Sequence, residues 1–283
     1  LLVDSPELNL PLARILTASG TRVVQYVAPQ VWAWRPGRAH LLRDRVHSLA
    51  LILPFEREVF AGTGVRTELV GHPLLDEPPP RPPDEVRARL GARADTTLVA
   101  LLPGSRAGEI ARLGPPMIEA GRRVARAGVR SVIAPAPVPA AAGIRRAARR
   151  ADVDSLPREL DARDLLGAAA AALIASGTAS LEAALAGTPH AVVYRVDPLS
   201  GLFARRLLRV PSIGLASLVA GRRVAPEITQ RQVEPGRLAA TLEARLDPAQ
   251  SARRRADLAE VRGRLGRPGA ADRVARLLLE ASR

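Results

Sequence analysis

Short apolar runs alternate with amphipathic segments along most of the chain, a pattern typical of α/β proteins. Toward the N-terminus, segment 8–20 has apolar residues at helical spacing and ends at Gly20, so it predicts a helix. The flanking runs are apolar on both faces, as the buried strands of a parallel sheet are. The strands predicted in this region are 1–4, 21–29, 47–55 and 66–71.

A second series of the same kind starts after residue 95. The longest apolar run, 165–176, is shorter than the roughly 20 residues that a membrane-spanning helix needs, so we interpret it as a helix end followed by a buried strand. Two amphipathic helices are predicted in the arginine-rich C-terminal part, at 234–246 and 272–282. The other elements predicted are strands 96–102, 131–135, 171–175 and 190–195, and helices 115–127, 142–150 and 178–186.

The stretch DEPPPRPPDE separates the two series. Its prolines are incompatible with a helix or a sheet interior, and they predict a stiff linker. The predicted fold class is therefore α/β, with two Rossmann-like domains and a helical tail. Ligands of such folds bind at the carboxyl ends of the strands. The predicted divisions are 1–76 for the first domain, 77–85 for the Pro-rich linker, 86–235 for the second domain and 236–283 for C-terminal helices.

Composition narrows the classes of partner. The 283 residues include no cysteine and no lysine, and arginine gives a formal net charge of +14. That charge indicates an anionic partner, or a genome rich in arginine codons, which the abundance of Ala, Pro and Gly also fits. Aromatic residues are only 2%, which argues against single-stranded nucleic acid because such binding uses stacked aromatic rings. The lack of cysteine excludes disulfides, thiolate metal sites and cysteine catalysis, and the four histidines show no metal-ligand spacing.

The first candidate binding segment is PGSR, at the end of predicted strand 96–102. Pro103 and Gly104 permit a tight turn, which would leave the backbone N–H groups of Ser105 and Arg106 free to face an anion. The guanidinium of Arg106 adds a permanently charged, planar group suited to phosphate oxygens. On this tetrapeptide alone, an ordinary turn with a surface arginine is the favoured alternative.

The segment ASGTASLEAALAG is the second candidate. Ser176 or Gly177 can cap the helix that follows, so that the N–H groups of Gly177, Thr178 and Ala179 face a ligand and the helix dipole favours phosphate. Glu182, one turn further on, either accepts hydrogen bonds from ribose hydroxyls or is an ordinary helix glutamate. Two phosphate-type turns in one domain indicate a nucleotide diphosphate. Neither turn has the Walker lysine or the G-x-G-x-x-G spacing, which excludes a P-loop or a dehydrogenase.

The third candidate is the segment VDSPELN in the other domain. Asp4 follows a predicted strand and precedes a proline that bends the chain, so its carboxylate is placed to face a cleft. The alternative is a helix N-cap formed by Asp4 or Ser5, with Pro6 at the first helical position and Glu7 in the first turn. The local pattern by itself favours the cap.

Taken together, these segments resemble the lipid-A-disaccharide synthase family. The resemblance runs nearly from end to end, and such a series in this order is not expected by chance. The segments that carry it are VDSPELN (3–9), YVAPQVWAWRPGR (26–38), LILPFE (51–56), VGHPL (70–74), LLPGSRAGEI (101–110), ASGTASLEAALAGTP (175–189), VVYR (192–195) and LVAGRRVAPEITQ (218–230).

The resemblance implies an inverting, metal-independent glycosyltransferase of the GT-B fold. The substrates would be UDP-2,3-diacylglucosamine and 2,3-diacylglucosamine 1-phosphate (lipid X), and the products lipid A disaccharide 1-phosphate, with a β-1,6 linkage, and UDP. Residues 1–76 would bind the acceptor and 86–235 the UDP-sugar, while 236–283 would pack back on the N-terminal domain or on a partner. If the C-terminal helices pack on a partner, the protein could form a homodimer.

The resemblance also implies roles for single residues. Asp4 matches a family aspartate and becomes the candidate general base on the acceptor 6-hydroxyl. Arg106 would stabilise the UDP diphosphate, whose charge grows as the glycosidic bond breaks. Gly177 and Thr178 would bind the same phosphates, and Glu182 the ribose. The implied nucleotide site comprises Gly104, Ser105, Arg106, Ser176, Gly177, Thr178, Glu182, Glu227 and Gln230.

Four residues are candidates for the acceptor site or the cleft. Trp32 and Trp34 alternate in VWAWR as if on one face of an extended segment, and they either line the acceptor site or pack the core. Arg35 either meets an acceptor or membrane phosphate or is simply solvated. His72, between Gly71 and Pro73, either hydrogen-bonds across the cleft or makes a structural turn.

The chain departs from the family at two places. The family's first strands, with a glycine-rich G-E-x-S-G-D loop, have no counterpart after Leu1, so we expect an N-terminally truncated chain with an incomplete first domain. Ser217 stands where the family usually has asparagine.

Other functions compete with the synthase hypothesis. One is another UDP-sugar enzyme of the same fold, such as the peptidoglycan N-acetylglucosaminyl transferase or the UDP-N-acetylglucosamine epimerase, and the VWAWR segment argues against both. A non-catalytic UDP-binding fragment and a basic nucleic-acid-binding protein are further alternatives, the last disfavoured by the low aromatic content. Because the implied substrates carry acyl chains, we expect a cytoplasmic protein bound peripherally to the inner face of a Gram-negative inner membrane, with arginine attracted to anionic lipid.

Overall fold

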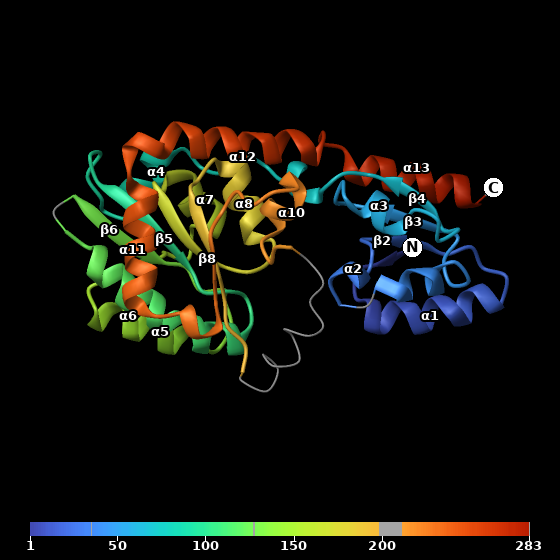
Figure 1. Cartoon of the computed structure of the whole chain (residues 1–283), viewed down its shortest axis with the longest axis horizontal. Coiled ribbons are helices and arrows are strands. Elements are labelled where there is room, and N and C mark those ends of the chain that lie inside the picture. The colour runs from blue at the N-terminus through green and yellow to red at the C-terminus, as the bar shows by residue number, and fades with distance from the viewer. Residues whose placement is uncertain (35, 127, 198–210, 283) are drawn as a thin grey trace. The chain divides into compact units, whose positions relative to one another are not determined.

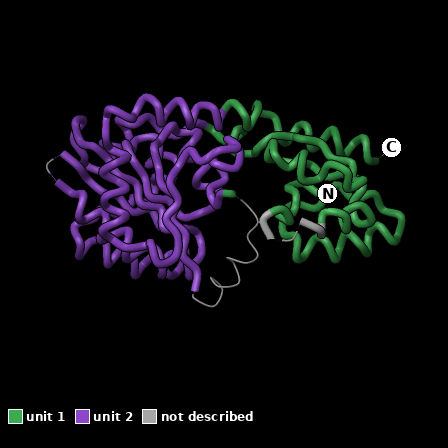
Figure 2. The backbone as a smooth tube through the Cα atoms, in the orientation of Figure 1, with its two compact units in different colours: residues 1–78, 203–211, 263–283 green, residues 79–202, 212–262 purple. Residues whose placement is uncertain are grey.

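The computed structural model describes residues 1–34, 36–126, 128–197 and 211–282 (Figure 1). The described residues form two compact units, shown in different colours in Figure 2. The first unit contains residues 1–78, 211 and 263–282, and the second contains 79–197 and 212–262. The predicted C-terminal segment, 236–283, is therefore divided between the two units.

The first unit is built on a four-stranded parallel sheet in the order β1-β2-β3-β4. Its strands are β1 (Leu2–Val3), β2 (Val24–Tyr26), β3 (Ser48–Leu51) and β4 (Arg66–Leu69). Its α-helices are α1 (Pro6–Ala18), α2 (Val31–Trp34), α3 (Glu56–Phe60) and α13 (Ala270–Ser282), and its 3-10 helices are η1 (Pro36–Leu42) and η2 (Pro73–Leu75).

Alternate residues of β3 enter two different cores of the first unit. Leu49 and Leu51 are fully buried on one face, in the same apolar cluster as Ala13 of α1 and Phe60 of α3. Ala50 points to the other face, where the apolar cluster includes residues of α13. The members of that second cluster are Val24, Ala50, Val70, Val274, Leu277 and Ala281. The apolar face of the C-terminal helix thus packs on the sheet of its own chain.

The second unit has a six-stranded parallel sheet in the order β10-β9-β8-β5-β6-β7. Its strands are β5 (Thr97–Leu102), β6 (Val129–Ile133), β7 (Asp154–Ser155), β8 (Ala171–Ala175), β9 (His190–Tyr194) and β10 (Glu227–Thr229). Its helices are α4 (Pro83–Arg89), α5 (Ala107–Val124), α6 (Ala141–Arg150), α7 (Ala162–Ala168), α8 (Ala179–Ala186), α10 (Leu215–Ala220), η3 (Gln230–Gln232), α11 (Pro235–Leu246), η4 (Pro248–Gln250) and α12 (Ser251–Leu265).

Helices cover both faces of this sheet, as the apolar runs predicted (Figure 1). In β5, Val99 and Leu101 face a core shared with α5, α6 and α11. Leu98, Ala100 and Leu102 face a core shared with α4, α7 and α8. The run 165–176 is confirmed as a helix end, in α7, followed by buried strand β8.

Helix α5 begins at Ala107, not near residue 115 as the sequence predicted. Proline is favoured at the first helical position and disfavoured in a helix interior. In the structure Pro115 and Pro116 both lie inside the helix. Tertiary packing outweighs the local preference, because the turns that precede the prolines bury Ile110 and Leu113 against the sheet.

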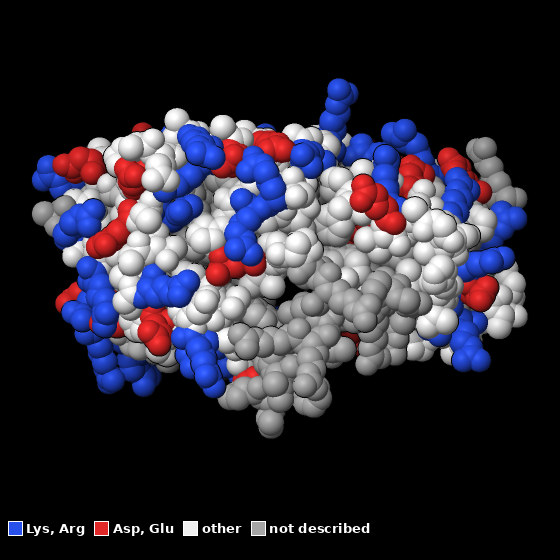
Figure 3. Space-filling view, in the orientation of Figure 1, with Lys and Arg blue, Asp and Glu red and all other residues white. Residues whose placement is uncertain are grey.

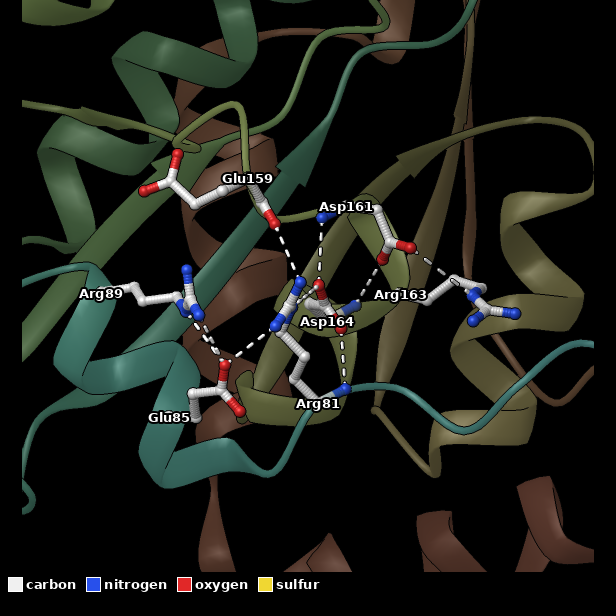
Figure 4. A network of polar contacts seen from close by, with 7 residues as sticks. All are labelled: Arg81, Glu85, Arg89, Glu159, Asp161, Arg163 and Asp164. Atoms are coloured by element: carbon white, nitrogen blue, oxygen red, sulfur yellow. Dashed lines mark hydrogen bonds and ion pairs between the residues drawn. The ribbon is translucent and has the colours of Figure 1, made fainter.

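The Pro-rich segment is fixed to the second unit from Pro79 onward. The backbone N–H of Arg81 donates to Asp164 Oδ1 at 2.8 Å, and the side-chain Nε of Arg81 lies 3.4 Å from Asp164 Oδ2 (Figure 4). Asp161 and Asp164 accept each other's backbone N–H at the start of α7, and Arg81 also pairs with Glu85 of α4. These contacts attach most of the predicted linker, 77–85, to α7.

Charge is spread over the visible surface. On the face shown in Figure 3, arginine side chains are interspersed with acidic ones rather than gathered in a single patch. Among the residues that the structure describes, every helix is too short or too polar to span a lipid bilayer.

Candidate active site

A cavity of about 1170 Å³ lies in the second unit, at the carboxyl ends of its strands. Strands β5 and β8 are neighbours with Leu102 opposite Ile174, so the turns that follow them meet although they are far apart in the sequence. Most of the residues predicted to bind nucleotide line this cavity. They are Gly104, Ser105, Arg106, Ser176, Gly177, Thr178 and Glu182.

The turn between β5 and α5 requires glycine at its centre. Gly104 has φ +110°, a conformation that side chains rarely adopt. A Cβ atom there would lie 2.5 Å from Glu109 Oε2 and 3.3 Å from the Cβ of Ala175. The absence of a side chain therefore allows the two turns to approach each other.

The N–H groups of Ser105 and Arg106 were expected to be free, and this was wrong. Both donate to Oε2 of Glu109, at 3.2 and 3.3 Å, while Arg106 Nη1 lies 2.9 Å from Glu109 Oε1. A glutamate three residues into a helix often accepts the N–H of the N-cap residue, which is the local reason for this contact. The turn does bind an anion, but the anion is a carboxylate of its own helix. The Arg106 side chain is 82% exposed, so this ion pair is screened by water.

The turn between β8 and α8 is more open. Gly177 has φ +146°, and a Cβ atom there would meet nothing within 4 Å. Thr178 rather than Ser176 or Gly177 is the N-cap, and its hydroxyl makes no capping bond. The Ser176 hydroxyl donates instead to the Ile213 carbonyl at 2.9 Å. Within the described residues no protein acceptor engages the N–H groups of this turn, which are Gly177, Thr178 and Ala179.

Sequence reasoning missed the other half of the cavity. Its walls there are the loop after β6, from Ala134 to Pro139, and the segment after β7, from Leu156 to Ala162. Arg145 of α6 joins α6 to the second of these walls, because its Nη1 donates to the Leu156 carbonyl at 2.7 Å. The run APAPVP, residues 134–139 at the end of predicted strand 131–135, was the available signal, since proline cannot continue a sheet interior.

Two predicted nucleotide residues lie outside the lining of this cavity. Glu227 Oε1 accepts the Ser212 hydroxyl and the N–H groups of Ile213 and Gly214, the latter two at 3.0 Å. It therefore holds the segment that leads into α10. Gln230 begins η3 with φ +50°.

Ser217, the position at which this chain departs from the family, is buried. Its hydroxyl accepts the N–H of Val224 at 3.2 Å. It therefore serves the turn that leads from α10 toward β10, within the second unit.

In the first unit, Asp4 leaves β1 as expected and its side chain is exposed. The N-cap of α1 is Ser5, and its side chain makes no capping hydrogen bond. Asp4 and Ser5 both have left-handed backbones, with φ 48° and 42°. Among the described residues, no hydrogen bond or ion pair is found for the Asp4 carboxylate. The carboxylate is thus not used for capping.

Trp32 lies in a short helix, α2, whereas the sequence predicted an extended segment. It is 8% exposed and packs edge-to-face on Phe55, with ring centroids 5.0 Å apart. Its Nε1 donates to Glu56 Oε1 at 3.4 Å. Of the two alternatives, packing within the unit is the one that Trp32 adopts. Trp34 ends the same helix, and Arg35 lies outside the described residues.

Glu56 is a buried carboxyl that the sequence did not single out. Its Oε2 accepts the N–H groups of Ile52 and Leu53 at 3.1 and 3.0 Å, and these bonds favour the ionised form. Burial outweighs them and raises the pKa of Glu56 from 4.5 to about 7.

His72 makes a structural turn. Its Nδ1 accepts the N–H of Leu74 at 3.2 Å, at the start of η2. Burial lowers the pKa of His72 from 6.5 to about 4, so the ring is neutral at pH 7. Within the described ranges, no three acidic or histidine side chains are grouped so that they could hold a metal ion.

Comparison with known proteins identifies the family. The family model described as lipid-A-disaccharide synthetase matches residues 1–280. The lipid-A-disaccharide synthase of Anaeromyxobacter dehalogenans (strain 2CP-C) is 42% identical over 291 aligned residues, which cover 100% of this chain and 75% of that protein. The enzyme of Myxococcus xanthus (strain DK1622) is 41% identical, with 99% and 74% covered.

Solved structures show the fold. A putative UDP-N-acetylglucosamine 2-epimerase from Listeria monocytogenes superposes with a TM-score of 0.64 at 15% identity, covering 97% of this chain and 71% of that one. A UDP-forming trehalose-phosphate synthase from Burkholderia xenovorans gives 0.53 at 12% identity, covering 99% and 72%. With two parallel sheets covered by helices, and with the family match over residues 1–280, the chain belongs to the lipid-A-disaccharide synthase family of GT-B glycosyltransferases, enzymes of lipid A biosynthesis.

Proposed function

We propose that this lipid-A-disaccharide synthase binds the UDP part of UDP-2,3-diacylglucosamine in the cavity of the second unit. The observation that carries this assignment is the meeting of two phosphate-type turns, after β5 and β8, in one cavity. Lipid X would be the acceptor, and Asp4 of the first unit the general base. No metal or cofactor takes part in the proposed reaction.

The cavity offers suitable groups for each part of the nucleotide. The N–H groups of Gly177 and Thr178 start α8, where the helix dipole favours an anion, so they bind the diphosphate. Arg106 adds a charged guanidinium at the same rim. Glu182 lines the same cavity and would accept hydrogen bonds from the ribose hydroxyls. The newly found walls, formed by the loops after β6 and β7, would enclose the base.

The proposed reaction is a single displacement with inversion. Asp4 takes the proton of the acceptor 6-hydroxyl while that oxygen attacks the anomeric carbon of the donor. The bond between the anomeric carbon and the β-phosphate oxygen breaks, and its electron pair leaves with UDP. Because negative charge grows on the diphosphate during this step, Arg106 stabilises the transition state more than the bound substrate.

The assay is UDP release from the donor in the presence of lipid X. It compares wild type with Asp4→Ala and Arg106→Ala, on this chain and on a form extended upstream, since the chain spans about three quarters of its relatives' length. We expect both variants to lose at least a factor of roughly 100 in kcat while remaining folded. Arg57→Ala, at an exposed arginine of the first unit, is the control.

Other results would separate the alternatives. UDP binding without turnover in either form of the protein would favour the non-catalytic UDP-binding fragment. Turnover of UDP-N-acetylglucosamine but not of the acylated donor would favour another GT-B sugar enzyme. Full activity of Asp4→Ala would contradict the general-base assignment.

We also propose peripheral association with the inner, cytoplasmic face of the inner membrane. The support is the net charge of +14 together with substrates that carry acyl chains. The test is sedimentation with vesicles containing anionic lipid, where binding at low salt that weakens at high salt is expected. Absence of binding at low salt would contradict it.

A homodimer through the C-terminal helices stays a prediction. Helix α13 places Val274, Leu277 and Ala281 against its own sheet, which uses its apolar face within one chain. Light scattering at several protein concentrations tests whether two copies associate.

A further inference from the structure

The carboxyl edge of the first sheet holds three non-glycine residues in the left-handed region. They are Asp4 with φ 48°, Ser5 with φ 42° and Val27 with φ 67°. Such a conformation is unfavourable for most residues and especially for a β-branched one. It persists only where the surrounding structure holds it, so the contacts of this edge identify what holds Asp4.

Gln25 of β2 provides one set of these contacts. Its side chain is fully buried, and its Nε2 lies 3.1 Å from the Asp4 carbonyl, 3.3 Å from that of Tyr26 and 3.2 Å from that of Val27. The opposite amide orientation would place Oε1 against three carbonyl oxygens, so these neighbours determine the orientation. One buried amide thereby links the chain after β1 to the chain after β2.

Asn9 of α1 provides the second set. It is 7% exposed, and its Nδ2 donates to the Val3 carbonyl at 2.8 Å and to the Asp4 carbonyl at 2.6 Å. The Asp4 N–H donates to the Tyr26 carbonyl at 2.9 Å. Every polar group of the Asp4 backbone is therefore engaged, and the carbonyl oxygen accepts from two buried amides.

These contacts fix the backbone of Asp4 and leave its carboxylate exposed. An ordinary helix start would place the N-cap in the extended region and use its side chain to cap. Here the N-cap residue Ser5 is left-handed and makes no such bond. The geometry points to a different purpose for the buried amides, namely to direct the carboxylate out of the sheet edge.

We infer that Gln25 and Asn9 are positioning residues, which hold the Asp4 carboxylate in the orientation needed to take the acceptor proton. This inference rests on the proposed role of Asp4 as general base. Removing the Gln25 amide frees the Asp4 carbonyl from one of its two donors, and the carboxylate then occupies the productive position for a smaller fraction of the time.

The test uses Gln25→Met in the active full-length protein, because methionine has a similar length and no amide. The expected result is a kcat lowered roughly 10- to 100-fold, with KM for the donor and the Kd for UDP within twofold of wild type, since UDP binds to the second unit. Gln30→Met, the same change at an exposed glutamine of the same unit, is the matched control and is expected to leave kcat unchanged.

The decisive measurement repeats Gln25→Met in an Asp4→Ala background. If Gln25 acts through Asp4, then Gln25→Met lowers kcat no further in a protein that already lacks the Asp4 carboxylate. If Gln25→Met lowered kcat by the same factor in the Asp4→Ala background as in wild type, the inference would be overturned. A wild-type kcat for Gln25→Met alone would also overturn it. Full activity of Asp4→Ala alone would instead overturn the proposed base itself, which separates the two failures.

A second variant covers the case in which Gln25→Met does not fold. Asn9→Leu removes the other amide donor to the Asp4 carbonyl with little change of size and no added charge. It is expected to lower kcat with unchanged UDP affinity, and likewise to have no added effect in the Asp4→Ala background. Unchanged kcat in a folded Asn9→Leu protein would contradict the inference.

Discussion

The two parallel sheets both carry candidate site residues at the carboxyl ends of their strands, but they hold the backbone there differently. In the second unit the two turns that line the cavity have glycines at their positive-φ positions, Gly104 and Gly177, whereas Gln230 after β10, with φ 50°, lies outside that lining. In the first unit the positive-φ positions at this edge are Asp4, Ser5 and Val27. Each non-glycine residue in this region costs of order 1–3 kcal/mol, which glycine avoids.

The difference follows from what each edge has to present. Under the proposed function, the second unit binds a diphosphate largely through backbone N–H groups, so it can use residues without side chains there. The proposed general base, Asp4, acts through its side chain, so glycine is unusable at position 4. The first unit keeps the strain and holds it with the buried amides of Gln25 and Asn9.

The largest expected effect comes from replacing the glycines of the two turns that line the cavity. Gly104→Ala would place a Cβ 2.5 Å from Glu109 Oε2, in addition to the backbone strain, so we expect a loss of roughly 2–4 kcal/mol in stability, UDP affinity or both. Gly177→Ala adds strain alone, because nothing lies within 4 Å, and should lose roughly half as much. Thermal unfolding and UDP titration calorimetry measure both. Equal effects of the two variants would contradict the steric argument.

Glu56 makes the stability of the first unit depend on pH near neutrality. Because burial raises its pKa from 4.5 to about 7, the folded state binds more protons than the unfolded state between these values. The free energy of unfolding therefore falls as pH rises through this window, by roughly 3 kcal/mol from this group. Glu56→Gln removes this contribution, so the difference in unfolding free energy between wild type and this variant should fall as pH rises through the window. The tryptophans, Trp32 and Trp34, lie in this unit, so their fluorescence in denaturant at pH 5 and pH 8 measures it.

The contribution of His72 to the stability of the same unit changes with pH in the opposite direction. Its pKa is lowered from 6.5 to about 4, so the unfolded state binds the extra proton and stability is lost as pH falls through this window, again by roughly 3 kcal/mol. Wild-type stability of the first unit should thus change little between pH 4.5 and 6.5, because Glu56 and His72 oppose each other. His72→Asn keeps an acceptor for the Leu74 N–H and should expose the fall due to Glu56.

In the second unit, burial lowers the pKa of His190 from 6.5 to about 4, so this group contributes stability that is lost as pH falls through that window. Amide hydrogen exchange in β9 should therefore show stability rising with pH across the window in which tryptophan fluorescence stays flat. Parallel pH profiles for the two units would contradict both assignments.

The smallest expected effect concerns Val27. At most positions alanine is more stable than glycine, but at φ 67° the order should reverse, with Val27→Gly more stable than Val27→Ala by about 1 kcal/mol. Val65, a half-buried residue of the same unit with negative φ, is the matched control and should show the normal order. Chemical denaturation of the four variants measures the difference. The normal order at Val27 would indicate that its backbone is not strained.

Local patterns explain how much of the site was predictable. PGSR and SGT are short turns between a strand and a helix, and their glycines indicate the backbone conformation directly, so the residues on this side of the cavity were predicted. Glu109 was missed because its carboxylate competes for the same N–H groups only once α5 has started at Ala107. The loops after β6 and β7 were missed because they line the cavity without matching any of the binding motifs considered in the sequence.

The sequence by itself determined the two series of strands and helices, the glycine turns and the family, because these depend on local periodicity, backbone freedom and ordered motifs. Tertiary structure decided which turns meet in one cavity, that prolines 115 and 116 lie inside a helix, and that Trp32 packs against Glu56. It also decided that Gln25 and Asn9 act on one carbonyl. The physical reason is that burial and hydrogen bonds between distant segments can outweigh local preferences of a few kcal/mol, and no local pattern records them.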